Sequence, residues 1–357
     1  MATTRPETPG SGNAAVSPGS DRLRKVSFGR RLLGRPAAGA AIITIFVWVV
    51  FAILGGQSGF LTPAGTLSYL DVAAQVGILG TSVALLMIAG EFDLSIGSMV
   101  GFAGIVIGVG VVQYGLPVWL AILAAIVLTT LLGVINGLLV VRTGLPSFIV
   151  TLATLFIIRG VTVAVTAAIT NITYIPIPHD LIAADPIAWI FNWSGGPRGE
   201  IKVSILWWII IAATGAYVLA KTKFGNWIAG VGGSATAARN LGVPVARVKI
   251  TLFASTAFSA AILAAITCMT FFSADVLRGR GKELDAITTA VIGGTLLTGG
   301  YGSVAGTAIG ALALGMAQIG IFFAGINSDW YMAAIGTLLL VAVVLNNWIR
   351  RRFAGIR

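Results

Sequence analysis

Charge is scarce in this chain of 357 residues. Charged side chains make up 10% of the sequence, against roughly a quarter in an ordinary soluble domain. Hydrophobic residues fill 57% of the positions, and they form repeated runs of about twenty residues, the length that a helix needs to cross about 30 Å of hydrocarbon. The runs do not alternate polar and apolar residues as the strands of a membrane barrel do. The composition therefore excludes a soluble domain and predicts an all-α, polytopic membrane protein.

Residue types that carry catalytic or metal-binding chemistry are also rare. Cys268 is the only cysteine, so no disulfide can form within the chain. His179 is the only histidine and has neither an HExxH pattern nor a cysteine partner. Residues 279–283 (GRGKE) lack the first glycine and the final Ser or Thr of a phosphate-binding loop. We therefore expect no catalytic residue, metal or cofactor in this chain, and movement of a solute across a membrane is the natural class of function.

The apolar runs predict about ten transmembrane helices with short broken-helix elements. Leu284–Leu297 is the weakest of them because it is too short to cross without neighbouring residues. The predicted spans are Ala37–Leu54, Val72–Ala89, Leu94–Val112, Pro117–Val141, Pro146–Thr170, Val203–Ala220, Ile250–Phe272, Leu284–Leu297, Val304–Ala324 and Trp330–Ile349. Together they predict one permease domain over residues 37–349, with a basic, disordered tail at 1–36 and a second basic tail at 350–357. An uncleaved first span fits the N-terminal pattern better than a signal peptide.

The basic residues predict the orientation of the spans. Ten spans place both termini on one side, and 17 of the 23 Lys and Arg residues then fall on that side, against 5 on the other. Positive residues accumulate on the cytoplasmic side of membrane proteins. The bias predicts cytoplasmic termini and a cytoplasmic loop at residues 221–249. Small residues four apart, such as Gly133 and Gly137, further predict close packing between helix backbones.

Acidic residues flank two of the apolar runs. Glu91 and Asp93 lie in Gly90–Ser98, between two predicted spans, where carboxylates are costly unless they have a role. Asp93 is expected to cap the next helix more readily than to contact a solute, and Glu91 is open between the two roles. Glu283 and Asp285 open the Leu284–Leu297 run. We expect them near the external face, where they either guard a solute entrance or cap a helix.

The cytoplasmic loop contains a short predicted helix. Ser234 is a plausible N-cap, Ala235–Asn240 favour a helix, and Gly242 favours its end. Its position between two turns is typical of a docking element, although the periodicity alone fits a solvated connector equally well.

The ordered set of these three segments resembles the permease subunits of bacterial ABC importers for ribose, xylose, arabinose and galactosides. The segments that carry the resemblance are Gly90–Ser98, Gly232–Val243 and Glu283–Ile287 with the glycine-rich stretch up to Gly302. The resemblance covers about residues 37–349. It implies a multi-pass protein of the bacterial inner membrane that works with a second permease copy or a homologous permease, a periplasmic sugar-binding protein and a cytoplasmic ABC ATPase that hydrolyses the ATP.

The resemblance also implies roles for individual residues. The cytoplasmic helix becomes the element that couples the permease to the ATPase, and a membrane-embedded arginine at 159 looks like a family feature. Candidate residues of a translocation path or gate are Glu91, Asp93, Ser95, Ser98, Arg159, Glu283 and Asp285. Candidate coupling residues are Gly232, Gly233, Ser234, Ala235, Ala238, Asn240 and Gly242.

The cargo is predicted to be a monosaccharide or related polyol. A nucleoside or an amino acid carried by the same type of importer is an alternative. An ion-coupled secondary transporter, with Glu91, Asp93 and Arg159 as an ion pathway, is a rival from another class.

Overall fold

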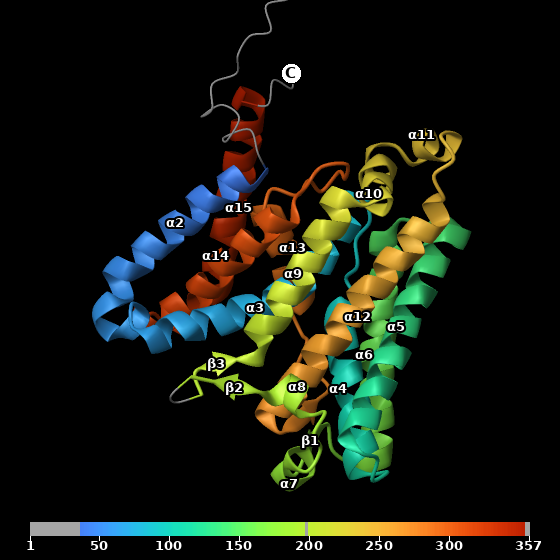
Figure 1. The fold of residues 1–357 in the computed structure, drawn as a ribbon, viewed down its shortest axis with the longest axis vertical. Coiled ribbons are helices and arrows are strands. Elements are labelled where there is room, and N and C mark those ends of the chain that lie inside the picture. Colours follow the sequence, from blue (N-terminus) through green and yellow to red (C-terminus); the bar gives the residue numbers. More distant parts are fainter. Residues whose placement is uncertain (1–35, 197–198, 354–357) are drawn as a thin grey trace, which may run out of the picture.

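The computed structural model describes residues 36–196 and 199–353, and they form a bundle of helices (Figure 1). Both predicted terminal tails lie largely outside the described residues, so those two predictions are untested. In the described part of the chain, eight helices are long and apolar enough to cross a membrane. The eight are α2 (Pro36–Gly55), α3 (Pro63–Ile88), α5 (Val118–Thr143), α6 (Ser147–Thr170), α9 (Val203–Lys221), α12 (Val245–Phe271), α14 (Val304–Phe323) and α15 (Tyr331–Phe353). The prediction of an all-helical, polytopic membrane protein is confirmed.

The two remaining predicted spans form shorter helices. Helix α4 (Ile96–Val112) has 17 residues and α13 (Lys282–Ile292) has 11. An 11-residue helix is about 16 Å long, roughly half the thickness of the hydrocarbon. The prediction of a span over Leu284–Leu297 is therefore wrong in its C-terminal bound, because the helix ends at Ile292. Gly294, Gly299 and Gly300 adopt positive φ, so the chain turns after Ile292 and forms no helix until α14 begins.

Short elements lie at the two ends of the bundle. Helices α10 (Lys223–Gly233) and α11 (Ala235–Asn240) lie on the same side as the start of α2 and the end of α15 (Figure 1). Toward the opposite end lie two small antiparallel strand pairs, two short helices and connecting turns. The elements there are β1 (Tyr174–Pro176), α7 (His179–Ala183), α8 (Trp189–Asn192), β2 (Ser194–Gly195), β3 (Ile201–Lys202) and β4 (Ser273–Asp275). A π-helical turn (Gly56–Phe60) follows α2, and a 3-10 turn (Ser328–Trp330) precedes α15.

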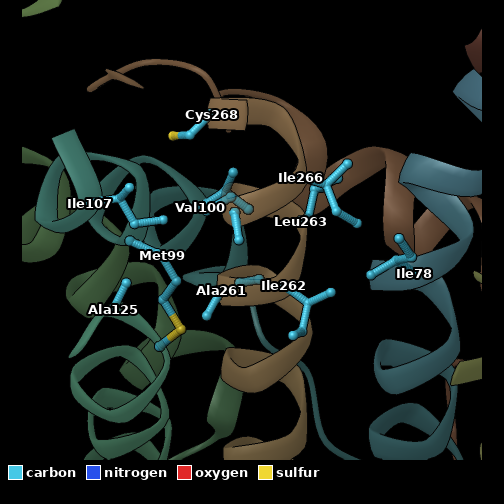
Figure 2. Packing of buried hydrophobic residues seen from close by; sticks show 14 of the residues in the cluster. Ile78, Met99, Val100, Ile107, Ala125, Ala261, Ile262, Leu263, Ile266 and Cys268 are labelled. Carbon is cyan, nitrogen blue, oxygen red and sulfur yellow. The ribbon is translucent and has the colours of Figure 1, made fainter. Parts of the chain in front are cut away.

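The core forms around α12, which packs against α3, α4 and α5. Figure 2 shows side chains of α12 between α3 on one side and α4 with α5 on the other, with Ile262 and Leu263 among those labelled. Gly133 and Gly137 of α5 face α12 so closely that a Cβ at Gly133 would overlap the Phe253 carbonyl oxygen, and one at Gly137 would lie 2.7 Å from the Ile250 Cα. The predicted role of this glycine spacing in close packing is confirmed.

A non-helical segment follows α4 along its length. A Cβ at Gly108 would lie 2.6 Å from the Ala274 Cβ, and Gly101 and Gly97 similarly contact the Val276 and Gly279 backbone. Residues 273–281 therefore run from the C-terminal end of α4 to its first turn. Irregular backbone at membrane depth needs a protein covering, and the glycine face of α4 provides it. This segment carries the start of α13 into the interior of the bundle.

Candidate functional site

Asp93 is the centre of a buried hydrogen-bond network. Its side chain is completely buried, and its Oδ1 accepts hydrogen bonds from the Ser95 backbone N–H (2.9 Å) and the Ser95 hydroxyl (2.5 Å). The hydroxyl of Thr256 on α12 donates to Oδ2 at 2.6 Å, and Asn136 Nδ2 of α5 donates to Ser95 Oγ at 2.8 Å. Helix α4 begins at Ile96 with Ser95 at its N-cap position and has no side-chain capping bond, so the expected cap by Asp93 is not found. The Asp93 carboxylate instead holds the turn before α4 and ties it to α12. The carboxylate is fully satisfied and has no exposed surface for a solute.

Glu91 forms an ion pair with Lys249 in the second turn of α12. Both side chains are largely buried, with 11% and 20% of their surface exposed. The pair borders a cavity of about 560 Å³. Residues 90–92, Arg239 of α11 and the first residues of α6 line this cavity. Glu91 is therefore a structural partner of α12 as well as a candidate residue of the path.

Arg159 and Glu283 meet deep in the bundle. Arg159 is midway along α6, and its Nη2 lies 3.6 Å from Glu283 Oε1 at the start of α13. The Arg159 Nη2 and Glu283 Oε2 atoms are buried and have no hydrogen-bond partner among the described residues. The expected position of Glu283 near the external face is wrong, because residues 273–281 lead the chain inward along α4 before α13 begins. The ion pair thus contains a donor and an acceptor that make no hydrogen bond, in a largely apolar bundle.

Of the other two candidate path residues, Ser98 supports this arrangement and Asp285 does not take part in it. The Ser98 hydroxyl donates to the Leu155 carbonyl of α6 at 3.0 Å, so it joins the first turn of α4 to α6. Asp285 lies 3.7 Å from Lys282 within α13. The structure brings Glu91, Asp93, Ser95 and Ser98 together at the start of α4, with Glu283 and Arg159 beside Gly97. Asp285 lies two residues after Glu283 and belongs to a separate pair with Lys282.

The predicted coupling helix forms as α11. Its N-cap is Ser234, whose hydroxyl accepts the Ala237 N–H at 3.2 Å, and Gly242 follows its end with φ +82°. Gly232 lies at the end of α10, close to the backbone of Ile88 in α3. A Cβ added to Gly232 would overlap the Ile88 carbonyl oxygen and lie 2.5 Å from the Gly300 N. Gly233 faces open space. The end of α10, just before α11, is therefore held by a contact between three backbones.

The faces of α11 differ in exposure. Ala238 is 4% exposed and packs in the cluster that contains Val248 and Phe253 of α12, so its side chain points inward. Asn240 and Arg239 are exposed, and Leu241 just after the helix is 85% exposed. Thr236 and Ala237 are exposed as well, so the surface available to a partner includes residues 236–237 and 239–241, and Ala238 holds α11 to α12.

Lys249, Thr256 and Asn136 are parts of the site that sequence reasoning missed. Each is the partner of a residue in Gly90–Ser98. A polar residue on an otherwise apolar helix was the only available signal, and it does not identify the partner.

The chain matches a family model described as "Branched-chain amino acid transport system / permease component" over residues 65–343. It is 31% identical to the probable ABC transporter permease protein YphD of Escherichia coli K12 over 88% of this chain and 90% of the relative. It is 31% identical to the ribose import permease protein RbsC of Haemophilus influenzae over 81% and 87%. Its identity to the xylose transport system permease protein XylH of E. coli K12 is 30% over 88% and 91%. No solved structure matches the chain.

The chain belongs to this family of ABC transporter permeases. It is a permease of the ABC sugar-importer type and a multi-pass protein of the inner membrane.

Proposed function

We propose that this permease translocates a neutral monosaccharide or related polyol, which a periplasmic binding protein delivers and which an ABC ATPase drives inward. The observation that carries the proposal is the pairing of charges in the candidate path. Glu91 pairs with Lys249, Arg159 with Glu283, and Asp285 with Lys282. A path lined by neutral pairs suits an uncharged cargo, whereas the charged ends of an amino acid would need fixed counter-charges.

The Arg159–Glu283 pair also suits a sugar in its hydrogen bonding. Arg159 Nη2 is an unused donor, and Glu283 Oε2 is an unused acceptor. Both atoms are buried in this conformation, so the path must open before a sugar reaches them. A hydroxyl group both donates and accepts hydrogen bonds, and one sugar hydroxyl can then satisfy both atoms. A transient contact of this kind is sufficient for a permease, because the binding protein captures the cargo and carries most of the selectivity. The relatives named for ribose and xylose support the same cargo class.

Reconstitution into vesicles with the cognate ATPase and binding protein tests the proposal. We expect radiolabelled sugar uptake that requires ATP and the binding protein and that persists when an ionophore removes the proton gradient. Uptake that continues without ATP would contradict the proposal. Loss of uptake when the ionophore removes the gradient while ATP is still present would favour an ion-coupled transporter.

An amino acid is the second candidate cargo, because the family description names branched-chain amino acid transport. Leucine and ribose, supplied in turn as unlabelled competitors, distinguish the two classes. Competition by ribose or xylose and none by leucine supports a sugar cargo.

The ATPase is proposed to dock on the exposed residues that follow Ala238. The face with α10 and α11 carries the predicted cytoplasmic excess of Lys and Arg. Leu241 is the natural apolar anchor there because it is 85% exposed and lies next to Arg239 and Asn240. Buried apolar anchors surrounded by polar residues dominate the binding energy of many protein interfaces.

Replacing Leu241 with aspartate should therefore weaken binding of the ATPase by about tenfold or more, since losing such an anchor costs about 2 kcal/mol. The folded bundle should be unaffected because the side chain contacts solvent. Leu181→Asp is a matched control, because Leu181 is 41% exposed on α7 toward the opposite end of the bundle. Co-purification of the ATPase measures the effect. Equal recovery with the two variants would remove Leu241 from the docking surface.

A further inference from the structure

We propose that Lys249 is a positioning residue, and that its ion pair with Glu91 is a latch that transmits movement of the coupling helix α11 to the start of α4. The inference rests on the proposed function and adds a residue and a route to it.

The chain connects the coupling helix directly to Lys249. Helix α11 ends at Asn240, and α12 begins at Val245 after a short turn. Ala238 is buried against α12, and Val243 N donates to the Ala238 carbonyl at 3.0 Å. The turn and the two helices therefore form one packed unit. A force applied to α11 reaches the first turns of α12 without passing through a flexible linker.

The same face of α12 holds the segment before α4 at two points. Lys249 and Thr256 are seven residues apart, which is about two helical turns, so both side chains face the same direction. Lys249 binds Glu91 and Thr256 binds Asp93. These two acids lie in the short segment that connects α3 to α4. Movement of α12 is therefore applied to this segment at two neighbouring residues.

The two attachment points differ in freedom. The Asp93–Thr256 bond is completely buried, with both residues at 0% exposure. The Glu91–Lys249 pair borders a cavity of about 560 Å³ that opens beside Arg239 of α11. The ion pair thus has room to change its geometry, whereas the Asp93 network has none. We infer that the Asp93 network is the fixed pivot and that the ion pair is the movable contact.

The start of α4 then carries the movement to the candidate path. Ser98 joins α4 to α6 through the Leu155 carbonyl. Gly97 lies against Glu283, the partner of Arg159. A shift of the first turn of α4 therefore acts on the Arg159–Glu283 pair. This gives a continuous set of contacts from the docking surface to the middle of the bundle.

The test uses the complete transporter in vesicles and measures sugar molecules taken up per ATP hydrolysed. The variants are Glu91→Gln, Lys249→Gln and the exchange Glu91→Lys with Lys249→Glu. Glutamine is close in size to both side chains, so the variants remove the charge with little change in packing. We expect each single variant to lower uptake per ATP about fivefold or more, while ATP hydrolysis continues. We expect the exchanged pair to recover uptake to within about twofold of the wild type, because it restores an ion pair.

Asp71→Asn is the matched control. Asp71 of α3 accepts a hydrogen bond from Ser204 of α9, so it also joins two helices. Neither Asp71 nor Ser204 is part of the proposed route from α11 through residues 90–95 to the Arg159–Glu283 pair. This variant should keep the wild-type ratio of uptake to ATP hydrolysis. Melting temperatures of all variants separate a loss of stability from a loss of coupling.

Three results would overturn the latch. The first is a wild-type ratio in Glu91→Gln, and the second is an equal loss of coupling in Asp71→Asn. The third is a failure of the exchanged pair to recover uptake although it is folded and binds the ATPase, which would make Glu91 a cargo contact. A wild-type complex that takes up no sugar would instead overturn the proposed function, and this inference with it.

Discussion

Replacing Gly232 with alanine should prevent the permease from accumulating as a folded membrane protein. A Cβ at this position would overlap the Ile88 carbonyl oxygen and lie 2.5 Å from the Gly300 N. These two atoms are hydrogen-bonded to each other at 2.8 Å, so the added methyl group would separate them. Backbone atoms cannot move aside as a flexible side chain can. We expect a cost of about 3 kcal/mol or more, at the upper end of the range for overpacked sites.

Gly233→Ala provides the matched control for this prediction. Gly233 is the next residue of α10, and a Cβ there meets no atom within 4 Å. Alanine also favours helix by up to about 1 kcal/mol over glycine. This variant should therefore reach wild-type levels in the membrane. Fluorescence size-exclusion chromatography of detergent extracts measures both variants, and similar peaks for the two would contradict the backbone contact.

Replacing Asp93 with alanine should destabilise the permease by about 3 kcal/mol. The carboxylate accepts hydrogen bonds from the Ser95 backbone, the Ser95 hydroxyl and Thr256. Alanine would leave the buried Ser95 N–H without its acceptor and would remove the Thr256 bond that joins the start of α4 to α12, while the Thr256 hydroxyl keeps the Phe253 carbonyl as an acceptor. We expect a clear fall in the melting temperature of the purified protein, and loss of uptake in the same variant. Asp93→Asn should be milder because one side-chain oxygen remains.

Asp275→Ala is the control that measures the local turn bond by itself, without the bond from α12. Asp275 Oδ1 accepts the Leu277 N–H at 2.9 Å, which is the same local bond that Asp93 makes to Ser95. Asp275 is less buried and no bond from another helix to its side chain is found in the described residues. We expect this variant to lose no more than about 1 kcal/mol. Equal melting temperatures for the two alanine variants would show that the bond from Thr256 contributes nothing.

The sequence predicts the helices well because each apolar run has the length that a membrane requires. The span over Leu284–Leu297 fails for a local reason, since Gly293 and Gly294 end α13 after Ile292 and the positive φ of Gly294 prevents its continuation. The depth of Glu283 fails for a tertiary reason. Residues 273–281 fit along the glycine face of α4, and this fit involves two segments that are far apart in the chain.

The candidate site was predicted only in part. Glu91, Asp93, Arg159 and Glu283 stand out because charge is costly within a membrane, and the structure gives each of the four a partner on another helix. Their partners could not be predicted, since a lone Lys249 or Thr256 has no periodic pattern that points to segment 90–95. The inward orientation of Ala238 was likewise hidden, because an alanine in a short helix fits an exposed face and a buried one equally well.

The junction of Ile88, Gly232 and Gly300 has a consequence for building hybrid transporters. It is made by main-chain atoms, so exchanging side chains around it cannot adapt it to a new ATPase. Adaptation is open at exposed side chains such as those after Ala238, where Leu241 projects from the surface. A grafting experiment should therefore transplant residues 239–241 and leave the glycines untouched. Side chains that bind the ATPase and main-chain contacts that hold the helices are therefore separate. The binding surface can be redesigned without changing the Ile88–Gly232–Gly300 junction.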